Sequence, residues 1–318
     1  MNTFATTIEE ISKANGEIRA GGTDFQERRR SRVSKGELID ITGLKGLDKI
    51  EKNSDGSTSI GTLVSIDTIA NDPFIQKSYS GLAEAAGALA TPQIRLVGTM
   101  GGSLLQRTRC HYYRNPHFDC YKKGGDSCPA REGEHTFGVC FDLGPCVFPH
   151  PSTLGMVLMA YGAEYELNGK EKHPIANLFG SGIDPHKDNS LKEGEVLTKI
   201  ILPKALENEK TAYFRSISRA RAEWPLVEVI ARLLVLDNTI TFASVAMGGV
   251  ANIPILLPRV NETLLNQPGN DATMEKAAKI ATEGANPSPD TAYKVDLVYG
   301  TVYETLRRAM KGLKNREA

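Results

Sequence analysis

The sequence predicts an α+β protein of two parts, and three observations support this. Short strand patterns alternate with helical segments before the first cysteine, Cys110. Long β-rich runs beyond Thr211 precede three helical segments, and the last of these carries apolar residues at every fourth position from Val298 to Met310. Because a single core seldom grows beyond about 250 residues, the chain of 318 residues is expected to form two domains, residues 1–206 and 207–318.

The first part begins with short strands and turns. "GEIRAGG" is typical of a strand that enters a glycine turn, and "ELIDITGL" of a second strand. "KIEKNSDGSTSIGT" predicts a β-hairpin with its turn at Asp55 and Gly56, and helices are expected at Ser65–Asn71 and Leu82–Leu89. This alternation indicates a domain of mixed sheet and helix.

The segment from residue 107 to residue 149 differs from the rest of the chain. It holds all five cysteines among scattered Gly, Pro and His, and it shows neither a period of 2 nor one of 3.6. So long an irregular segment inside a domain is usually functional or tied down. A bound metal centre would tie it down.

Regular patterns return after His150. "PSTLGMVLMAYGA" predicts a helix, "AEYELNGKEKHP" a hairpin with an Asn168-Gly169 turn, and "EVLTKIILP" a strand. The polar stretch Lys204–Lys210 is interpreted as the linker between the domains. Three strands are expected beyond it, in "AYFRSIS", "WPLVEVIARLLVLD" and "TITFASVAMGGV".

Composition narrows the classes of partner. Lys and Arg number 38 and Asp and Glu number 38, so no net charge draws the chain to nucleic acid or to an anionic membrane. The basic cluster Arg28–Arg32 is interpreted as a solvated loop face. The longest apolar run, Met156–Ala163, is far shorter than the ~18 residues of a membrane span, so membrane insertion is not expected. Without signal-peptide features at its start, we expect a cytoplasmic protein, with co-export on a partner's signal to the periplasm as the alternative.

Two glycine pairs are candidates for binding an anion. The phosphate loop G-x-x-x-x-G-K-[ST], H-E-x-x-H, G-x-S-x-G and a helix-opening G-x-G-x-x-G are all absent from the sequence. "AGGTD" and "GTMGGS" instead place Gly21-Gly22 and Gly101-Gly102 beside hydroxyl residues. Such turns let backbone N–H groups approach a diphosphate closely. The alternative for each pair is a plain turn.

The cysteines indicate metal binding. They follow one another at steps of 10, 8, 12 and 6 residues from Cys110 to Cys146, without the close C-x₂₋₄-C pairs of structural zinc sites. An odd set clustered in one segment also fits a disulfide framework poorly. An iron–sulfur cluster, a zinc ion and unligated thiols all stay open on spacing alone. His111, His117 and His135 lie in the same segment and are candidates to replace a thiolate.

These motifs together resemble a known family. "IRAGGTDF" and "QIRLVGTMGGSLLQ" are similar to the two flavin-binding motifs of the FAD-binding medium subunits of molybdenum hydroxylases, the xanthine dehydrogenase, carbon monoxide dehydrogenase and aldehyde oxidoreductase family. "EGEVLTKIILP" and "VAMGGVANIPI" extend the resemblance along the chain. "LLQRTRC", the later cysteines and "HPS" resemble the branch with an extra [4Fe-4S] loop, which includes the FAD subunits of periplasmic aldehyde oxidoreductase and 4-hydroxybenzoyl-CoA reductase.

The resemblance implies a fold and a set of FAD contacts. Residues 1–206 would form a two-subdomain FAD-binding domain of the vanillyl-alcohol-oxidase type, with the cysteine-rich loop 107–149 inside it. Residues 207–318 would form a C-terminal domain of the CO dehydrogenase flavoprotein type, with a three-stranded antiparallel sheet and helices. Thr153 stands where the family has Asp, and Ser103 where it usually has Asn. The residues expected to bind FAD are Arg19, Ala20, Gly21, Gly22, Thr23, Asp24, Phe25, Thr99, Gly101, Gly102, Ser103, Thr153 and Arg215.

For the [4Fe-4S] cluster, the resemblance matches Cys110, Cys120 and Cys128 to the first three ligands. Cys146 is preferred as the fourth, because the following "FPHPS" anchors the position, and Cys140 is the alternative. The cofactors expected from the resemblance are therefore FAD and one [4Fe-4S] cluster.

The function implied is electron transfer within a heterotrimeric molybdenum hydroxylase. An aldehyde, aromatic or N-heterocyclic substrate would be oxidised on a large molybdenum-cofactor subunit. Electrons would cross a small [2Fe-2S] subunit to FAD here and leave to an external acceptor such as a ferredoxin. No side chain of this chain is expected to act as an acid–base catalyst. The alternatives are a stand-alone flavoprotein oxidoreductase and a zinc-stabilised binding module.

Overall fold

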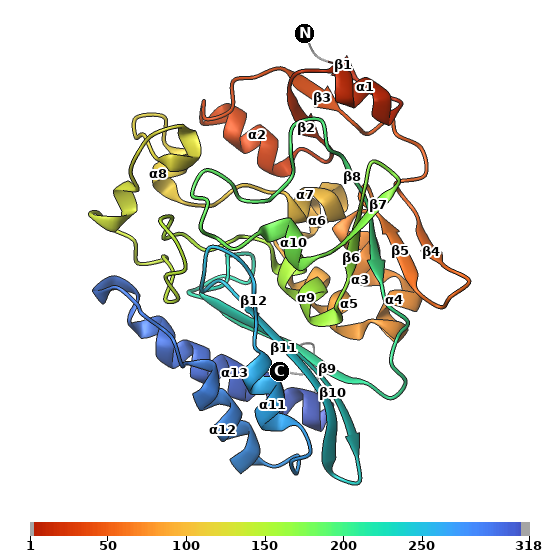
Figure 1. The fold of residues 1–318 in the computed structure, drawn as a ribbon, viewed down its shortest axis with the longest axis vertical. Coiled ribbons are helices and arrows are strands. Elements are labelled where there is room, and N and C mark those ends of the chain that lie inside the picture. The colour runs from red at the N-terminus through yellow and green to blue at the C-terminus, as the bar shows by residue number, and fades with distance from the viewer. Residues whose placement is uncertain (1–2, 313–318) are drawn as a thin grey trace.

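The computed structural model describes residues 3–312, whose strands form three separate sheets (Figure 1). The two terminal stretches of the predicted domains, residues 1–2 and 313–318, lie outside the described residues. The first sheet is parallel, with strand order β1-β3-β2. Its strands and the two helices beside them are β1 (Thr3–Phe4), α1 (Ile8–Lys13), β2 (Glu17–Arg19), α2 (Thr23–Arg30) and β3 (Leu38–Asp40).

Helix α2 corrects the interpretation of the basic cluster. The run begins inside a helix and not in a solvated loop, and Arg28 is only 8% exposed. Its guanidinium forms ion pairs with Glu17 and Asp24. A helix was not expected here because the run TDFQERRR lacks an apolar stripe, and its buried face consists of Phe25 and Arg28.

A five-stranded antiparallel sheet forms the centre of the first domain, in the order β4-β5-β8-β6-β7. Both predicted hairpins are present in it. The Asn168-Gly169 turn has φ values of 51° and 73°, the left-handed conformation that a tight hairpin turn needs. The strands are β4 (Ile50–Lys52), β5 (Thr58–Gly61), β6 (Glu164–Leu167), β7 (Glu171–Pro174) and β8 (Leu197–Leu202).

Helices bury one face of this sheet. The predicted apolar helix is α9. Ser152 caps its start by accepting a hydrogen bond from Gly155 N–H, and at its end the C-cap residue Gly162 adopts the left-handed conformation. The shared core includes Ile60, Leu82 and Ile200, each fully buried. The helices are α3 (Ile66–Asn71), α4 (Pro73–Ser78), α5 (Ser80–Ala88), α6 (Pro92–Val97), α7 (Met100–Leu104), α9 (Thr153–Tyr161) and α10 (Ala176–Phe179).

The C-terminal domain is a helix-covered antiparallel sheet of order β12-β11-β10-β9. Its three long strands are the predicted ones, and the two-residue β12 adds a short edge. The three helices lie along the side of the sheet away from the first domain (Figure 1). The elements are β9 (Lys210–Ser216), β10 (Val227–Leu236), β11 (Thr239–Gly248), β12 (Ile255–Leu256), α11 (Pro258–Leu264), α12 (Asp271–Ala281) and α13 (Tyr293–Lys311). The 3₁₀ turn η3 (Pro289–Thr291) precedes α13.

The cysteine-rich segment runs along one side of the molecule between α2 and α13 (Figure 1). It contains only one short helix and two 3₁₀ turns, α8 (His111–Arg114), η1 (Tyr121–Lys123) and η2 (Pro129–Arg131). The C-terminal domain ties down its second half, because Cys140 N–H donates to Val250 O at 2.9 Å and Lys294 Nζ donates to Phe137 O at 3.2 Å. Within residues 3–312, no helix combines the length and the apolar character of a membrane span.

A buried ion pair of the C-terminal domain contacts the first domain through its arginine. Arg232 on β10 and Glu209 before β9 are each 6% exposed at the side chain and lie 2.7 Å apart. The Arg232 guanidinium also donates to Ala160 O of α9 at 2.7 Å and lies 3.9 Å from the centre of the Tyr161 ring. Burial raises the pKa of Glu209, and Arg232 offsets part of that effect.

Arg232→Met is expected to lower the free energy of unfolding by about 3–5 kcal/mol, because it leaves Glu209 buried without its cation. Urea denaturation measures the change. Arg259→Met removes the exposed Arg259–Glu283 pair and should cost less than about 1 kcal/mol. Equal losses in the two variants would contradict the role given to the buried pair.

Candidate functional site

The first glycine loop links β2 to α2. Gly22 has φ of 75°, which favours glycine, and it stands at the N-cap of α2. Because Gly22 offers no side chain, no side-chain cap engages the first N–H groups of α2. The side chain of Arg19 lies against Gly22, and its Nε is buried with no hydrogen-bond partner in the described part of the chain. The loop thus presents donors that an anion would satisfy.

The second glycine loop runs from Gly98 to Ser103, and Gly98 and Thr99 link α6 to α7. The expected turn at Gly101 and Gly102 is corrected by the structure, which places both glycines in the first turn of α7. Thr99 caps α7, since its Oγ1 accepts a hydrogen bond from Gly102 N–H at 3.1 Å. A Cβ at Gly101 would lie 2.9 Å from the Cβ of Thr62, so the backbone packs closely there. Ser103 is buried in the same turn.

The structure brings the two loops into contact. A Cβ on Gly21 would lie 1.9 Å from Val97 O, and one on Gly98 would lie 3.8 Å from Thr23 Oγ1. Two segments about 75 positions apart in the chain therefore lie side by side. Both motifs must lie this close together if they bind the same ligand. This contact depends on glycine at position 21, since any Cβ would overlap a backbone carbonyl.

Other predicted FAD residues have protein partners in the structure. Arg19 pairs with Asp40. Phe25 is buried, with the guanidinium groups of Arg28 and Arg29 at 5.6 and 5.5 Å from its ring centre. Thr153 is fully buried, and its hydroxyl donates to Glu228 at 2.8 Å. Arg215 lies in a large cavity.

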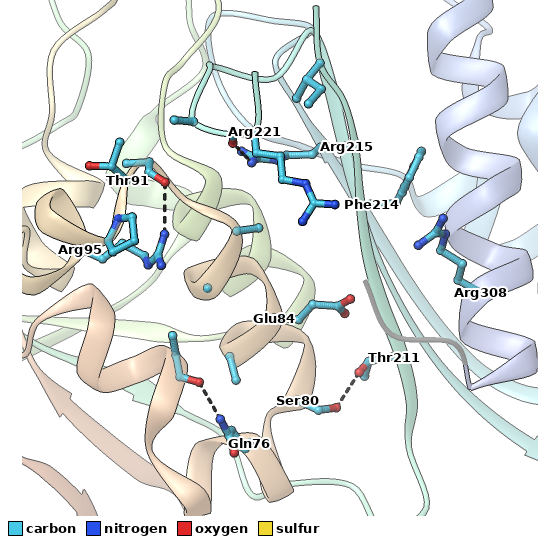
Figure 2. A pocket seen from close by; sticks show the side chains of 18 residues that line it. Gln76, Ser80, Glu84, Thr91, Arg95, Thr211, Phe214, Arg215, Arg221 and Arg308 are labelled. Carbon is cyan, nitrogen blue, oxygen red and sulfur yellow. Dashed lines mark hydrogen bonds between the residues drawn. The ribbon is translucent and has the colours of Figure 1, made fainter. Parts of the chain in front are cut away.

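That cavity measures about 840 Å³ and lies where the first domain meets the C-terminal one (Figure 2). On the side of the first domain it is lined by Thr91, the N-cap of α6, and by Arg95 within α6. On the other side it is lined by Thr211 and Phe214 of β9. Four arginines and one glutamate border it, which makes the cavity cationic: Arg95, Arg215, Arg221, Arg308 and Glu84. Helix α6 has six residues and so spans about 9 Å. Its start lines the cavity and its end touches the first glycine loop, so one extended ligand could reach both.

An ion-pair network joins the first glycine loop to the cysteine-rich segment. Asp24 Oδ1 lies 3.1 Å from Arg109 and 2.7 Å from Arg114, and Glu27 pairs with the same two arginines at 2.7 and 2.8 Å. Burial raises the pKa of Asp24, but the charges of Arg109 and Arg114 more than offset this, so its pKa lies below the ordinary value. Asp24 is therefore ionised and fixed by cations.

The sequence prediction missed this network and a stacking contact beside it. Arg109 lies 4.4 Å from the ring centre of Trp224, a side chain on the β9–β10 loop that is 44% exposed. A signal was present in the sequence, because "TDFQE" is acidic and "QRTRCHYYR" basic. Nothing in local spacing, however, says that these two stretches meet.

Four cysteines line one small cavity: Cys110, Cys120, Cys128 and Cys146. Three of them, Cys110, Cys120 and Cys128, stand at the N-caps of α8, η1 and η2. Cys140 does not line this cavity and is fully buried in the core of the C-terminal domain. None of the histidines is among the described residues that line it.

Burial keeps two of these thiols, Cys110 and Cys146, protonated at neutral pH. Burial raises the pKa of Cys110 to about 12, although the backbone of Tyr113 and Tyr112 hydrogen-bonds to its sulfur and lowers it. Burial also raises the pKa of Cys146 to about 11. Within residues 3–312, no three His, Cys, Asp or Glu side chains are close enough together to hold a single metal ion.

Comparisons with known proteins identify the class. Residues 2–205 match the family described as FAD binding domain in molybdopterin dehydrogenase, and residues 212–309 match the CO dehydrogenase flavoprotein C-terminal domain. The aldehyde oxidoreductase FAD-binding subunit PaoB of Escherichia coli (strain K12) is 30% identical over 302 residues, 91% of this chain and 90% of that protein. The nicotinate dehydrogenase FAD-subunit of Eubacterium barkeri is 25% identical over 292 residues, 89% of this chain and 84% of that one.

Solved structures share the fold. A carbon monoxide dehydrogenase chain from Hydrogenophaga pseudoflava superposes with a TM-score of 0.77 at 19% identity, covering 98% of this chain and 96% of that one. A chain of quinoline 2-oxidoreductase from Pseudomonas putida 86 gives a TM-score of 0.76 at 19% identity, covering 98% of each.

The fold and the two glycine loops thus define an FAD-binding oxidoreductase subunit. The chain belongs to the molybdenum hydroxylase family, as one of its FAD-binding medium subunits. This membership confirms the expected family, fold class and FAD cofactor. It leaves no support for the interpretation as a zinc-stabilised binding module.

Gly21→Ala is expected to weaken FAD binding at least about tenfold, a loss of about 1.4 kcal/mol, because the new Cβ would overlap Val97 O and push the two loops apart. Fluorescence titration of the FAD-free protein measures the affinity. Gly300→Ala, inside α13 with open space around it, is the matched control and should leave the affinity unchanged. Wild-type affinity in Gly21→Ala would show that the contact between the loops does not shape the site.

Proposed function

We propose that this chain passes electrons between a small [2Fe-2S] subunit, FAD and an external acceptor inside a multi-subunit molybdenum hydroxylase. The observation that carries the proposal is the contact between the two glycine loops beside a large cationic cavity. Bound FAD supplies one- and two-electron chemistry, and the chain supplies binding, orientation and exclusion of side reactions. The substrate would be an aldehyde, an aromatic compound or an N-heterocycle that reacts on another subunit.

The proposed FAD site uses both loops and the cavity. Arg19 to Phe25 and Thr99 to Ser103 would hold the diphosphate, because the unpartnered Arg19 Nε and the uncapped amides of α2 are donors suited to an anion. The ring system would occupy the cavity lined by Arg215. Four guanidinium groups there favour a ligand that gains negative charge when it is reduced.

We further propose a [4Fe-4S] cluster on Cys110, Cys120, Cys128 and Cys146. The support is that these four thiols line one cavity although they span 37 positions of the chain. The donor set suits iron, because four thiolates are the usual ligands of such clusters and backbone N–H groups already face the sulfur of Cys110. Burial in the opposite domain argues against Cys140 as the fourth ligand. The proposed cluster loop would exchange electrons with a partner such as a ferredoxin.

The proposed partners are a large molybdenum-cofactor subunit and a small [2Fe-2S] subunit. Relatives named as medium subunits or chains of complexes support this, such as the nicotine 6-hydroxylase medium subunit of Paenarthrobacter nicotinovorans. Leu96 and Val97, 63% and 53% exposed, add apolar surface beside the glycine loops of the kind that partners cover. A stand-alone flavoprotein that reacts directly with a small anion is the second candidate, and the cationic cavity is the observation in its favour. The cytoplasmic location stays a prediction.

Substitution of single cysteines tests the cluster. Cys146→Ser should abolish the broad visible absorption of the cluster and most of the bound iron while flavin absorption stays, because one of four ligands is lost. Cys140→Ser is the matched control and should keep both signals. The reverse pattern would assign the fourth ligand to Cys140, and a colourless, iron-free wild-type protein would remove the cluster from the proposal.

Co-purification tests the partners. A tagged chain isolated from its natural source should carry a molybdenum-containing large subunit and a small iron–sulfur subunit in fixed proportion. Recovery of the chain alone, with FAD that a small substrate reduces directly, would favour the stand-alone flavoprotein.

A further inference from the structure

A buried group of charges lies beside the cysteine cavity. Lys122 Nζ is 2.8 Å from Asp188 Oδ1, and Arg107 Nε donates to the other carboxylate oxygen at 2.5 Å. The side chains of Lys122 and Asp188 are only 6% and 5% exposed. Charged side chains are seldom buried so fully unless they are paired. The pairing explains how these two are tolerated, but not why they are there.

Lys122 belongs to the wall of the cavity that the four cysteines line. It follows Cys120 by two positions in η1, and its Nζ also donates to Lys187 O at 2.7 Å, which fixes the side chain. Its side chain and the thiols of the four proposed ligands line the same cavity. The ammonium group therefore lies beside the position proposed for the cluster.

Asp188 keeps this charge partly neutralised. Burial raises the pKa of Asp188, but Arg107 and Lys122 outweigh that effect and hold its pKa at about 2, so the carboxylate is ionised at neutral pH. His150 faces it through a contact of 3.1 Å from Nε2 to Asp188 O, and burial lowers the pKa of His150 to about 4, so this ring is neutral. Arg131, a cation in η2 of the same segment, is paired with Asp142.

A buried pair of this kind adds little to stability that an apolar pair could not supply. The position of the pair beside the cysteine cavity is more important than its effect on stability. Where water is excluded, a fixed charge interacts strongly with other charges over short distances. An iron–sulfur cluster becomes more negative when it accepts an electron, and net charge around it sets its reduction potential. A lysine that lines the cavity therefore stabilises the reduced form of the cluster. An aspartate paired with that lysine reduces this stabilisation.

We propose that Lys122 is a positioning residue that raises the reduction potential of the cluster, and that Asp188 limits the effect. The inference rests on the proposed function, since it needs the cluster on Cys110, Cys120, Cys128 and Cys146. It assigns to this chain a pair of opposite charges that tunes electron flow through the cysteine-rich segment.

A redox titration followed by electron paramagnetic resonance, on the full chain with its cluster, tests the proposal. Lys122→Met should shift the reduction potential to more negative values, and Asp188→Asn should shift it to more positive ones. Lys122→Arg keeps the charge and should stay close to the wild type. Lys276→Met makes the same chemical change at an exposed side chain on α12 and should also leave the potential unchanged.

Shifts of the same sign in Lys122→Met and Asp188→Asn would indicate a general disturbance of the segment and would overturn the proposal. So would equal potentials in Lys122→Met and the wild type. If Lys122→Met loses its cluster, the comparison of Asp188→Asn with the wild type decides, and an unchanged or more negative potential there refutes the inference. A wild-type chain without any cluster signal would instead refute the cluster itself, which separates the two failures.

Discussion

The arrangement of the site depends on the ion pairs that the carboxylate of Asp24 forms. It stands two residues after Gly22, at the start of α2, and it meets Arg28, Arg109 and Arg114. A carboxylate so enclosed must be matched by cations. Helix α2 contributes Arg28, and the cysteine-rich segment contributes Arg109 and Arg114. The first glycine loop and the segment that follows the second loop are thereby fixed to each other. The proposed FAD site and the position of Cys110 are structurally linked for this reason.

The cysteine-rich segment is bound to both domains. Its first half is bound to α2 through Arg109 and Arg114, and its second half is bound to the C-terminal domain. The backbone of Cys140 takes part in two of these contacts, as Cys140 N–H donates to Val250 O and Cys140 O accepts from Asn286 N–H, both at 2.9 Å. An irregular chain can be buried only when its backbone polar groups find such partners. The structure therefore gives Cys140 a packing role and leaves the other four thiols around one cavity.

Much of the fold could be predicted because its signals are local. The hairpin turns at Asn168-Gly169 and at Asp237 and Asn238 adopt positive φ values as their residue types suggest. The apolar face of α13 and the long strands of the C-terminal sheet also follow from period alone. Helix α2 was missed because its stability comes from ion pairs and the packing of Phe25, not from an apolar stripe. The six-residue α6 and five-residue α7 are too short to show a period.

The sequence by itself determined the first glycine turn, the two hairpins, the long strands and the apolar helices and, through the resemblance, the family. Those features depend on neighbours in the chain or on motifs of a few residues. Tertiary structure alone decided which distant groups meet: Gly21 with Val97, Asp24 with Arg114, and Lys122 with Asp188. It also separated Cys140 from the other cysteines, which spacing could not do. The physical reason is that burial and charge pairing are properties of three-dimensional neighbours, and the linear chain does not encode them at any fixed spacing.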